Sequence, residues 1–166
     1  GAGGIEPRVF RAAGATGPTA ATMVLLTADL GAWPNTTHLA ATGLNFNAAT
    51  GSYYHFEFGV VYQSAATTTG LSLGLTFPAV TVFAATVEIP LTTAAAAAMF
   101  HGWITATGGT VTATTTPTAT TNYLATIYGL IIASTGGQVQ VTRGSEVTGS
   151  NVTIKQGSYG IVELLA

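Results

Sequence analysis

The chain has 166 residues, about one domain's worth, of which 48% are hydrophobic and only 6% are charged, with a formal net charge of −2. Its four basic residues lie near the two ends of the chain, whereas binding to nucleic acid or to an anionic membrane surface needs clustered Lys and Arg, so neither partner is expected. The sequence has no cysteine, which excludes disulfides and cysteine-based zinc sites, and its longest apolar runs, of about ten residues, are too short to span a membrane as a helix.

Residues 1–20 differ from the rest of the chain. They include "GATGPT" at 14–19, in which Gly14 and Gly17 are three residues apart and Pro18 follows, a single collagen-like triplet step. So short a piece cannot form a triple helix alone. We therefore expect residues 1–20 to be an extended arm or linker and residues 21–166 to form the folded domain.

Residues 21–166 have the pattern of an all-β domain. β-branched residues and alternation with a period of two dominate, and clusters of Gly, Thr and Asn separate the runs. We predict a β-sandwich or jelly roll of about ten short strands. The candidate strands are 22–28, 37–46, 53–63, 71–77, 80–89, 99–107, 109–115, 123–133, 138–142, 151–155 and 159–165.

The segment 53–63, "YYHFEFGVVYQ", is a clear strand candidate. Side chains two residues apart in a strand point to the same face of the sheet. One face is predicted to lie in the core and carries Tyr54, Phe56, Phe58, Val60 and Tyr62. The opposite face carries Tyr53, His55, Glu57, Gly59, Val61 and Gln63.

The segment 71–77, "LSLGLTF", alternates even more strictly, with Leu71, Leu73, Leu75 and Phe77 on one face. The connection "SAATTTG" before it is rich in turn-forming residues. We therefore expect the 71–77 strand to pair with 53–63.

The run "LTTAAAAAMFHGW" departs from the β pattern. Five consecutive alanines at 94–98 favour a helix, and Thr92 or Thr93 could cap its N-terminus. We predict one short helix near residues 93–100, crossing between the sheets. Farther along, the Thr-rich and Pro-containing stretch 110–121 suits an exposed hairpin or loop edge rather than a core strand.

His55 and Glu57 form the best polar pair in the sequence. Because they are two residues apart, their side chains share a strand face, and a general-base pair is conceivable. A hydrolase would also need a nucleophile or a polarising group, and the sequence has no Cys and no G-x-S-x-G elbow. We expect a non-enzymatic protein in which His55 and Glu57 lie at a subunit contact, and a hydrolase using the two is the remote alternative.

No metal or cofactor is expected. The three histidines, His38, His55 and His101, are scattered without ligand spacing. The glycine pairs at 107–109 and 135–137 lack the Lys of a phosphate loop, and a turn role explains Asp29 better than a ligand role.

Four aromatic residues are candidates for stacking on sugar rings, should the protein bind glycans: Trp33, Trp103, Tyr53 and Tyr159. Their alternative role is in the core or at an interface. The low charge also predicts much weakly polar surface, and such surfaces are usually covered by other subunits. Self-association or docking on a larger assembly is therefore expected.

The order of motifs resembles a β-rich module of structural proteins from tailed bacteriophages. The resemblance rests on Thr42 to Phe46, Tyr54 to Phe58, Tyr62 to Leu71 and Gly157 to Tyr159, and covers most of residues 25–165. It implies a virion structural protein on the outer surface of the particle, foremost a capsid decoration or cement protein. The expected partners are copies of itself, as a homotrimer, and the major capsid protein. The alternative is a tail-fibre or head-fibre module that binds host surface glycans.

Overall fold

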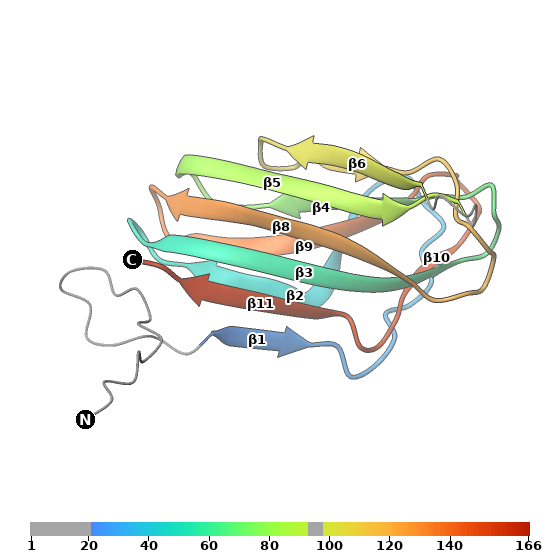
Figure 1. The fold of residues 1–166 in the computed structure, drawn as a ribbon, viewed down its shortest axis with the longest axis horizontal. Coiled ribbons are helices and arrows are strands. Elements are labelled where there is room, and N and C mark those ends of the chain that lie inside the picture. Colours follow the sequence, from blue (N-terminus) through green and yellow to red (C-terminus); the bar gives the residue numbers. More distant parts are fainter. Residues whose placement is uncertain (1–20, 93–97) are drawn as a thin grey trace, which may run out of the picture.

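The computed structural model describes residues 21–92 and 98–166, and this part of the chain is all-β (Figure 1). Eleven strands form two antiparallel sheets that face each other, which confirms the predicted β-sandwich class. The strands are β1 (Thr22–Leu25), β2 (Leu39–Ala48), β3 (Tyr53–Ser64), β4 (Leu71–Thr76), β5 (Val80–Pro90), β6 (Met99–Ile104), β7 (Thr110–Thr112), β8 (Tyr123–Ala133), β9 (Gly137–Ser145), β10 (Val152–Ile154) and β11 (Tyr159–Leu164).

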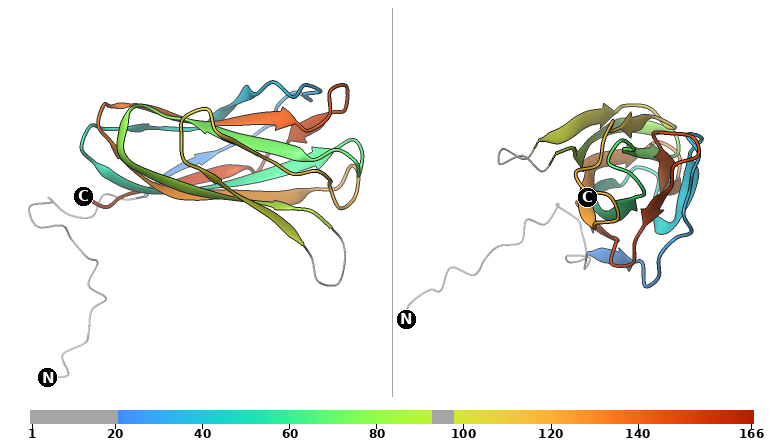
Figure 2. Two further views of the ribbon diagram at one scale, coloured as in Figure 1. Left: turned by 90° about the horizontal axis from the view of Figure 1, so that it is seen from above. Right: turned by 90° about the vertical axis from the view of Figure 1, so that its right-hand side faces the viewer.

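The larger sheet has the strand order β1-β11-β3-β8-β5-β6, and β10 pairs with the last residues of β3. The smaller sheet has the order β2-β9-β4-β7. The two layers are visible in the edge-on views of Figure 2. Since consecutive strands often belong to different sheets, the chain crosses the core repeatedly.

The predicted pairing of 71–77 with 53–63 is wrong. β4 pairs with β9 and β7 in the smaller sheet, whereas β3 lies in the larger one. Residues 65–70 carry the chain from the larger sheet to the smaller one. The Ser64 hydroxyl donates to the carbonyls of Ala66 and Thr69 at the start of this connection. At its end, Gly70 lies so close to the Ala113 carbonyl that a Cβ at position 70 would be 1.7 Å from the carbonyl oxygen. The crossing sets the leucine face of β4 opposite the phenylalanine face of β3, which a hairpin within one sheet could not do.

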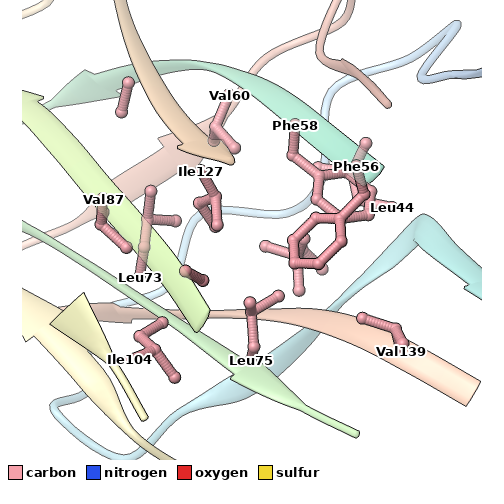
Figure 3. Close-up of a cluster of buried hydrophobic side chains, with 14 of the residues drawn as sticks. Leu44, Phe56, Phe58, Val60, Leu73, Leu75, Val87, Ile104, Ile127 and Val139 are labelled. Atoms are coloured by element: carbon pink, nitrogen blue, oxygen red, sulfur yellow. The ribbon is translucent and has the colours of Figure 1, made fainter. Parts of the chain in front are cut away.

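The core lies between the two sheets and follows the predicted alternation. Phe56, Phe58, Val60 and Tyr62 of β3 are fully buried, and Tyr54 is partly buried. Figure 3 shows the first three among side chains from both sheets. Each fully buried side chain of this size contributes about 1.5–3 kcal/mol relative to an exposed one, so this face fixes which side of β3 points outward.

The predicted helix near 93–100 is wrong where the structure describes it. Met99 and Phe100 belong to β6, and Met99 lies opposite Pro90 of β5 in an antiparallel pair. The backbone N–H of Leu91 donates to the carbonyl of Ala98 at 2.9 Å, which extends the β5–β6 pairing by one more hydrogen bond. Strand pairing therefore takes the place of a helix at residues 99 and 100, while residues 93–97 of the prediction, and the predicted arm 1–20, lie outside the described residues.

The Thr-rich stretch 110–121 is an edge, as predicted, but part of it is buried. β7 is the last strand of the smaller sheet, whereas Ala113 and Thr116 are buried. The Thr116 hydroxyl donates to the Thr69 carbonyl at 2.7 Å. This loop therefore closes one end of the sandwich instead of standing free of it.

Candidate functional site

The outer face of the larger sheet, hereafter the larger-sheet face, consists of the outward side chains of six paired strands. Antiparallel register aligns these side chains in rows across the sheet. The central row contains, in order from β6 to β1, Trp103, Thr86, Tyr128, Glu57, Ile161 and Met23. Large apolar side chains thus occupy outward positions that polar residues usually take in a solvated antiparallel sheet.

Several of these apolar side chains are strongly exposed. Trp103 is 78% exposed and Met23 is 71% exposed, while Tyr128 in the middle of the row is 42% exposed. Leu25 on β1 and Leu124 on β8 are also exposed. Large exposed apolar side chains gathered on one sheet face are typical of an interaction site rather than of a solvent face.

His55 and Glu57 both point outward, as predicted, but they do not form a pair. His55 lies opposite Glu163 on β11, and its Nδ1 is 3.6 Å from the Glu163 Oε2. Glu57 lies between Tyr128 and Ile161 and forms no ion pair among the described residues. The geometry therefore gives no support to a hydrolase that uses His55 with Glu57.

A second histidine–glutamate pair escaped the sequence analysis. His101 of β6 lies opposite Glu88 of β5, with His101 Nδ1 3.4 Å from Glu88 Oε1. The helix predicted near 93–100 left no reason to expect β5 and β6 to pair, and so concealed this pair of residues. Both histidine–glutamate pairs lie on the larger-sheet face.

The four candidate sugar-stacking residues do not converge. Trp103 lies at the β6 edge and Tyr53 at the start of β3. Tyr159 lies flat across β3, because Gly59 leaves room for its ring: a Cβ at Gly59 would be 2.2 Å from the ring. Trp33 lies in the connection between β1 and β2, and its indole N–H donates to the Thr37 carbonyl. No pair of them forms a common platform for one sugar.

The outer face of the smaller sheet, hereafter the smaller-sheet face, has a different composition. Its strands present amides and hydroxyls, including Asn47 of β2, Gln140 of β9 and Thr76 of β4. The Gln140 side-chain amide donates to the carbonyls of Ala41 and Leu44, at 3.0 and 3.1 Å, where the β2–β9 register shifts. These outward groups therefore meet the backbone or water.

A hydrogen-bonded chain of side chains crosses the smaller-sheet face. His38 Nδ1 is 2.8 Å from the Thr142 hydroxyl, His38 Nε2 is 2.6 Å from the Ser72 hydroxyl, and Ser72 is 2.7 Å from the Thr112 hydroxyl. Burial lowers the pKa of His38 from its ordinary value of 6.5, so that the imidazole is neutral near pH 7. One ring nitrogen then donates and the other accepts.

This chain includes a serine bonded to a histidine, the arrangement that a nucleophile requires. However, Ser72 is only 3% exposed, and its hydroxyl is also bonded to Thr112. The other nitrogen of His38 meets the Thr142 hydroxyl, where a serine triad has a carboxylate. The arrangement therefore fits a structural bridge between β9, β4 and β7 better than catalysis.

Two charged features lie away from both outer faces. Asp29 has the predicted turn role: it accepts from the backbone N–H of Gln156 at 2.8 Å and pairs with Lys155, whose hydrogen bond is the main reason that the pKa of Asp29 is lowered. Arg143 points into the sandwich, is 5% exposed and donates to the Gly31 carbonyl at 2.6 Å. Burial lowers the pKa of Arg143. Sequence gave no sign of this buried arginine.

Within residues 21–92 and 98–166, no three His, Asp or Glu side chains gather into a possible metal site. A groove of about 320 Å³ lies between β2 and β11, with Asn45, Asn47, Tyr54 and Leu164 among its lining residues. None of the residues that line it is ionisable except Tyr54.

The described residues contain no helix long and apolar enough to cross a membrane. No protein family model and no curated protein matches this sequence.

Proposed function

We propose that this chain is a non-enzymatic structural protein of bacteriophage particles, foremost a decoration protein on the outside of the capsid. The observation that carries the proposal is the larger-sheet face, where large exposed apolar side chains occupy outward positions that polar residues usually take in a solvated sheet. A surface of this kind suits contact with another protein subunit, and subunit contacts are what a decoration protein depends on. The sequence resemblance to phage structural modules supplies the setting.

The mechanism of such a protein is mechanical. Subunits that bind only the assembled lattice stabilise it by mass action, and each contact buries area that must be exposed again before capsid subunits separate. The two packed sheets give a rigid body for this purpose, because the core fixes the outward rows in place.

The test uses virus particles purified from the source of the sequence. Mass spectrometry of these particles should detect the chain, and antibodies raised against it should label the capsid in electron micrographs. Removing the protein should lower the temperature at which the particles open. Particles that lack the chain, or particles whose thermal and osmotic stability does not change when it is removed, would contradict the proposal.

A fibre module that binds host glycans is the second candidate, and the exposure of Trp103 favours it. An indole that is 78% exposed at a sheet edge can stack on a sugar ring. A glycan array probed with the full chain should then show binding that Trp103→Ala abolishes and Trp33→Phe retains. Absence of binding by the full chain, together with capsid labelling, would leave decoration as the function.

A further inference from the structure

The two most exposed large hydrophobic side chains of the described residues lie at opposite ends of one row. Trp103 ends the central row of the larger-sheet face on β6, and Met23 ends it on β1. The centre of the six strands in this row falls between β8 and β3, where Tyr128 lies opposite Glu57. The row is therefore organised symmetrically about its middle, with an exposed apolar group at each end.

We infer that a second copy of this chain covers the larger-sheet face, related to the first by a two-fold axis that runs parallel to the strands between β8 and β3. Such an axis preserves the rows and reverses the order of the strands within them. Trp103 of one copy then faces Met23 of the other, and a sulfur–aromatic contact is favourable. The same axis sets Tyr128 over Glu57 of the second copy.

The charges of the face fit this axis. The neighbouring row runs from His101 on β6 to Leu25 on β1, and the two-fold sets Glu88 of β5 opposite the backbone of Tyr159 on β11 of the second copy. Glu57, which forms no ion pair among the described residues, meets the Tyr128 phenol of the second copy, which can donate a hydrogen bond, while Glu88 keeps His101 as its neighbour. A two-fold axis along the central row would instead stack Glu57 on Glu57, and like charges in contact oppose association.

The area of the face is sufficient for such a contact. Six strands about 4.8 Å apart span roughly 24 Å, and the outward positions from Tyr53 to Val61 extend about 26 Å along β3. Each copy would bury about 600 Å² of flat footprint, and the pair about 1,200 Å², which reaches the lower end of the range for stable interfaces. Two twisted sheets pack face to face in this aligned manner in ordinary sandwiches.

The smaller-sheet face is not an equivalent alternative, because its outward side chains are mainly hydroxyls and amides, and those of Ser72, Thr112, Thr142 and Gln140 are engaged with His38, with one another or with the backbone. The alignment of the outward rows across a two-fold axis also favours two copies over the three that the sequence resemblance implies. It depends only on the larger-sheet face and holds whether or not the chain decorates a capsid.

The absence of native cysteine allows a direct test of the axis. The double variant Trp103→Cys with Met23→Cys is treated with a short bismaleimide cross-linker, alongside each single variant as a control. Within one chain these positions are five strand spacings apart, roughly 24 Å, so a short linker cannot join them. Both side chains are exposed, and an unchanged melting temperature verifies that the variants fold.

The expected result is a covalent dimer from the double variant and negligible cross-linking of either single variant. In solution the unmodified chain should have a mass of about 33 kDa, twice the 16.7 kDa of one copy. A chain that stays monomeric at high concentration would overturn the inference. Single variants that cross-link as well as the double variant would also overturn it, as would a ladder of three or more chains.

Discussion

The two outer faces of this sandwich are built on the same core yet present opposite chemistry. The larger-sheet face carries Trp103, Tyr128 and Met23 at exposed outward positions, together with two histidine–glutamate pairs. The smaller-sheet face carries amides and hydroxyls and a half-buried His38. Alternation in the sequence thus specifies which side of a strand is buried, while the outward residues specify whether the sheet meets water or a partner.

The largest expected effect comes from a charge at the centre of the larger-sheet face. Tyr128→Glu should weaken self-association by about 100-fold or more, because both copies lose a central aromatic contact and set a second carboxylate against Glu57 of the other copy. Thr76→Glu on β4 is the matched control, since Thr76 is exposed and lies on the smaller-sheet face. Sedimentation equilibrium of both variants gives the dissociation constants. Equal effects of the two substitutions would erase the distinction between the faces.

The next largest difference between the faces is expected in the stability lost when a glycine on each face is replaced by alanine. A Cβ at Gly74, on the smaller-sheet face, would be 2.6 Å from the Thr142 hydroxyl and 2.8 Å from the carbonyl oxygen of Gly109. At Gly59, on the larger-sheet face, it would meet the far end of the Tyr159 side chain, which can swing away. Gly74→Ala should therefore lower the free energy of unfolding by about 1–3 kcal/mol and Gly59→Ala by less than about 1 kcal/mol.

Urea unfolding of both glycine variants, at a concentration where each is monomeric, measures this difference. A larger loss in Gly59→Ala than in Gly74→Ala would show that Tyr159 is held more rigidly than the hydrogen-bonded chain around His38.

His38 predicts a pH dependence that belongs to the smaller-sheet face. Its pKa is lowered in the folded chain by burial, so the unfolded chain binds the proton more readily and stability rises with pH in this range. The contribution of the neutral, buried His38 to stability is complete above pH 6.5, the ordinary pKa of histidine. It is lost as the pH falls from 6.5 toward the lower pKa of the folded chain. His38→Gln should flatten the dependence of unfolding free energy on pH between about pH 5 and about pH 7.5. An unchanged slope in the variant would contradict the role given to burial.

The smallest expected effect concerns the ion pair outside both faces. Asp29→Asn removes the partner of Lys155, and the lowered pKa of Asp29 means that its contribution is present above pH 3.8 and lost as the pH falls. Since the carboxylate is exposed, the loss of stability should be slight and should shrink further at high salt. Thermal melts of Asp29→Asn at low and high salt measure it, and a large salt-independent loss would contradict a screened surface pair.

The sequence predicts where the strands lie better than it predicts which strands pair with one another. The strand 123–133 was predicted with the bounds that β8 has, and Phe56 and Phe58 are core residues as expected. The sheet to which β4 belongs was not predictable, because alternation specifies a buried face and not the neighbouring strand. Long-range pairing decides the neighbour.

The candidate site shows the same limit. His55 points outward as the alternation requires, yet its partner is Glu163, which the β3–β11 register brings opposite it. The pair of Glu88 with His101 depends on a hairpin that five alanines made look helical. The exposure of Trp103 likewise follows from its place on an edge strand.

The difference between the two faces is tested most directly by hydroxyl-radical footprinting of the unmodified chain at low and high concentration, read residue by residue by mass spectrometry. Concentration should protect Trp103, Tyr128 and Met23 on the larger-sheet face and leave Leu39 of the smaller sheet equally reactive. Two results would contradict the assignment of the larger-sheet face as the docking surface. One is protection of Leu39 in place of the other three residues, and the other is unchanged reactivity of all four residues at high concentration.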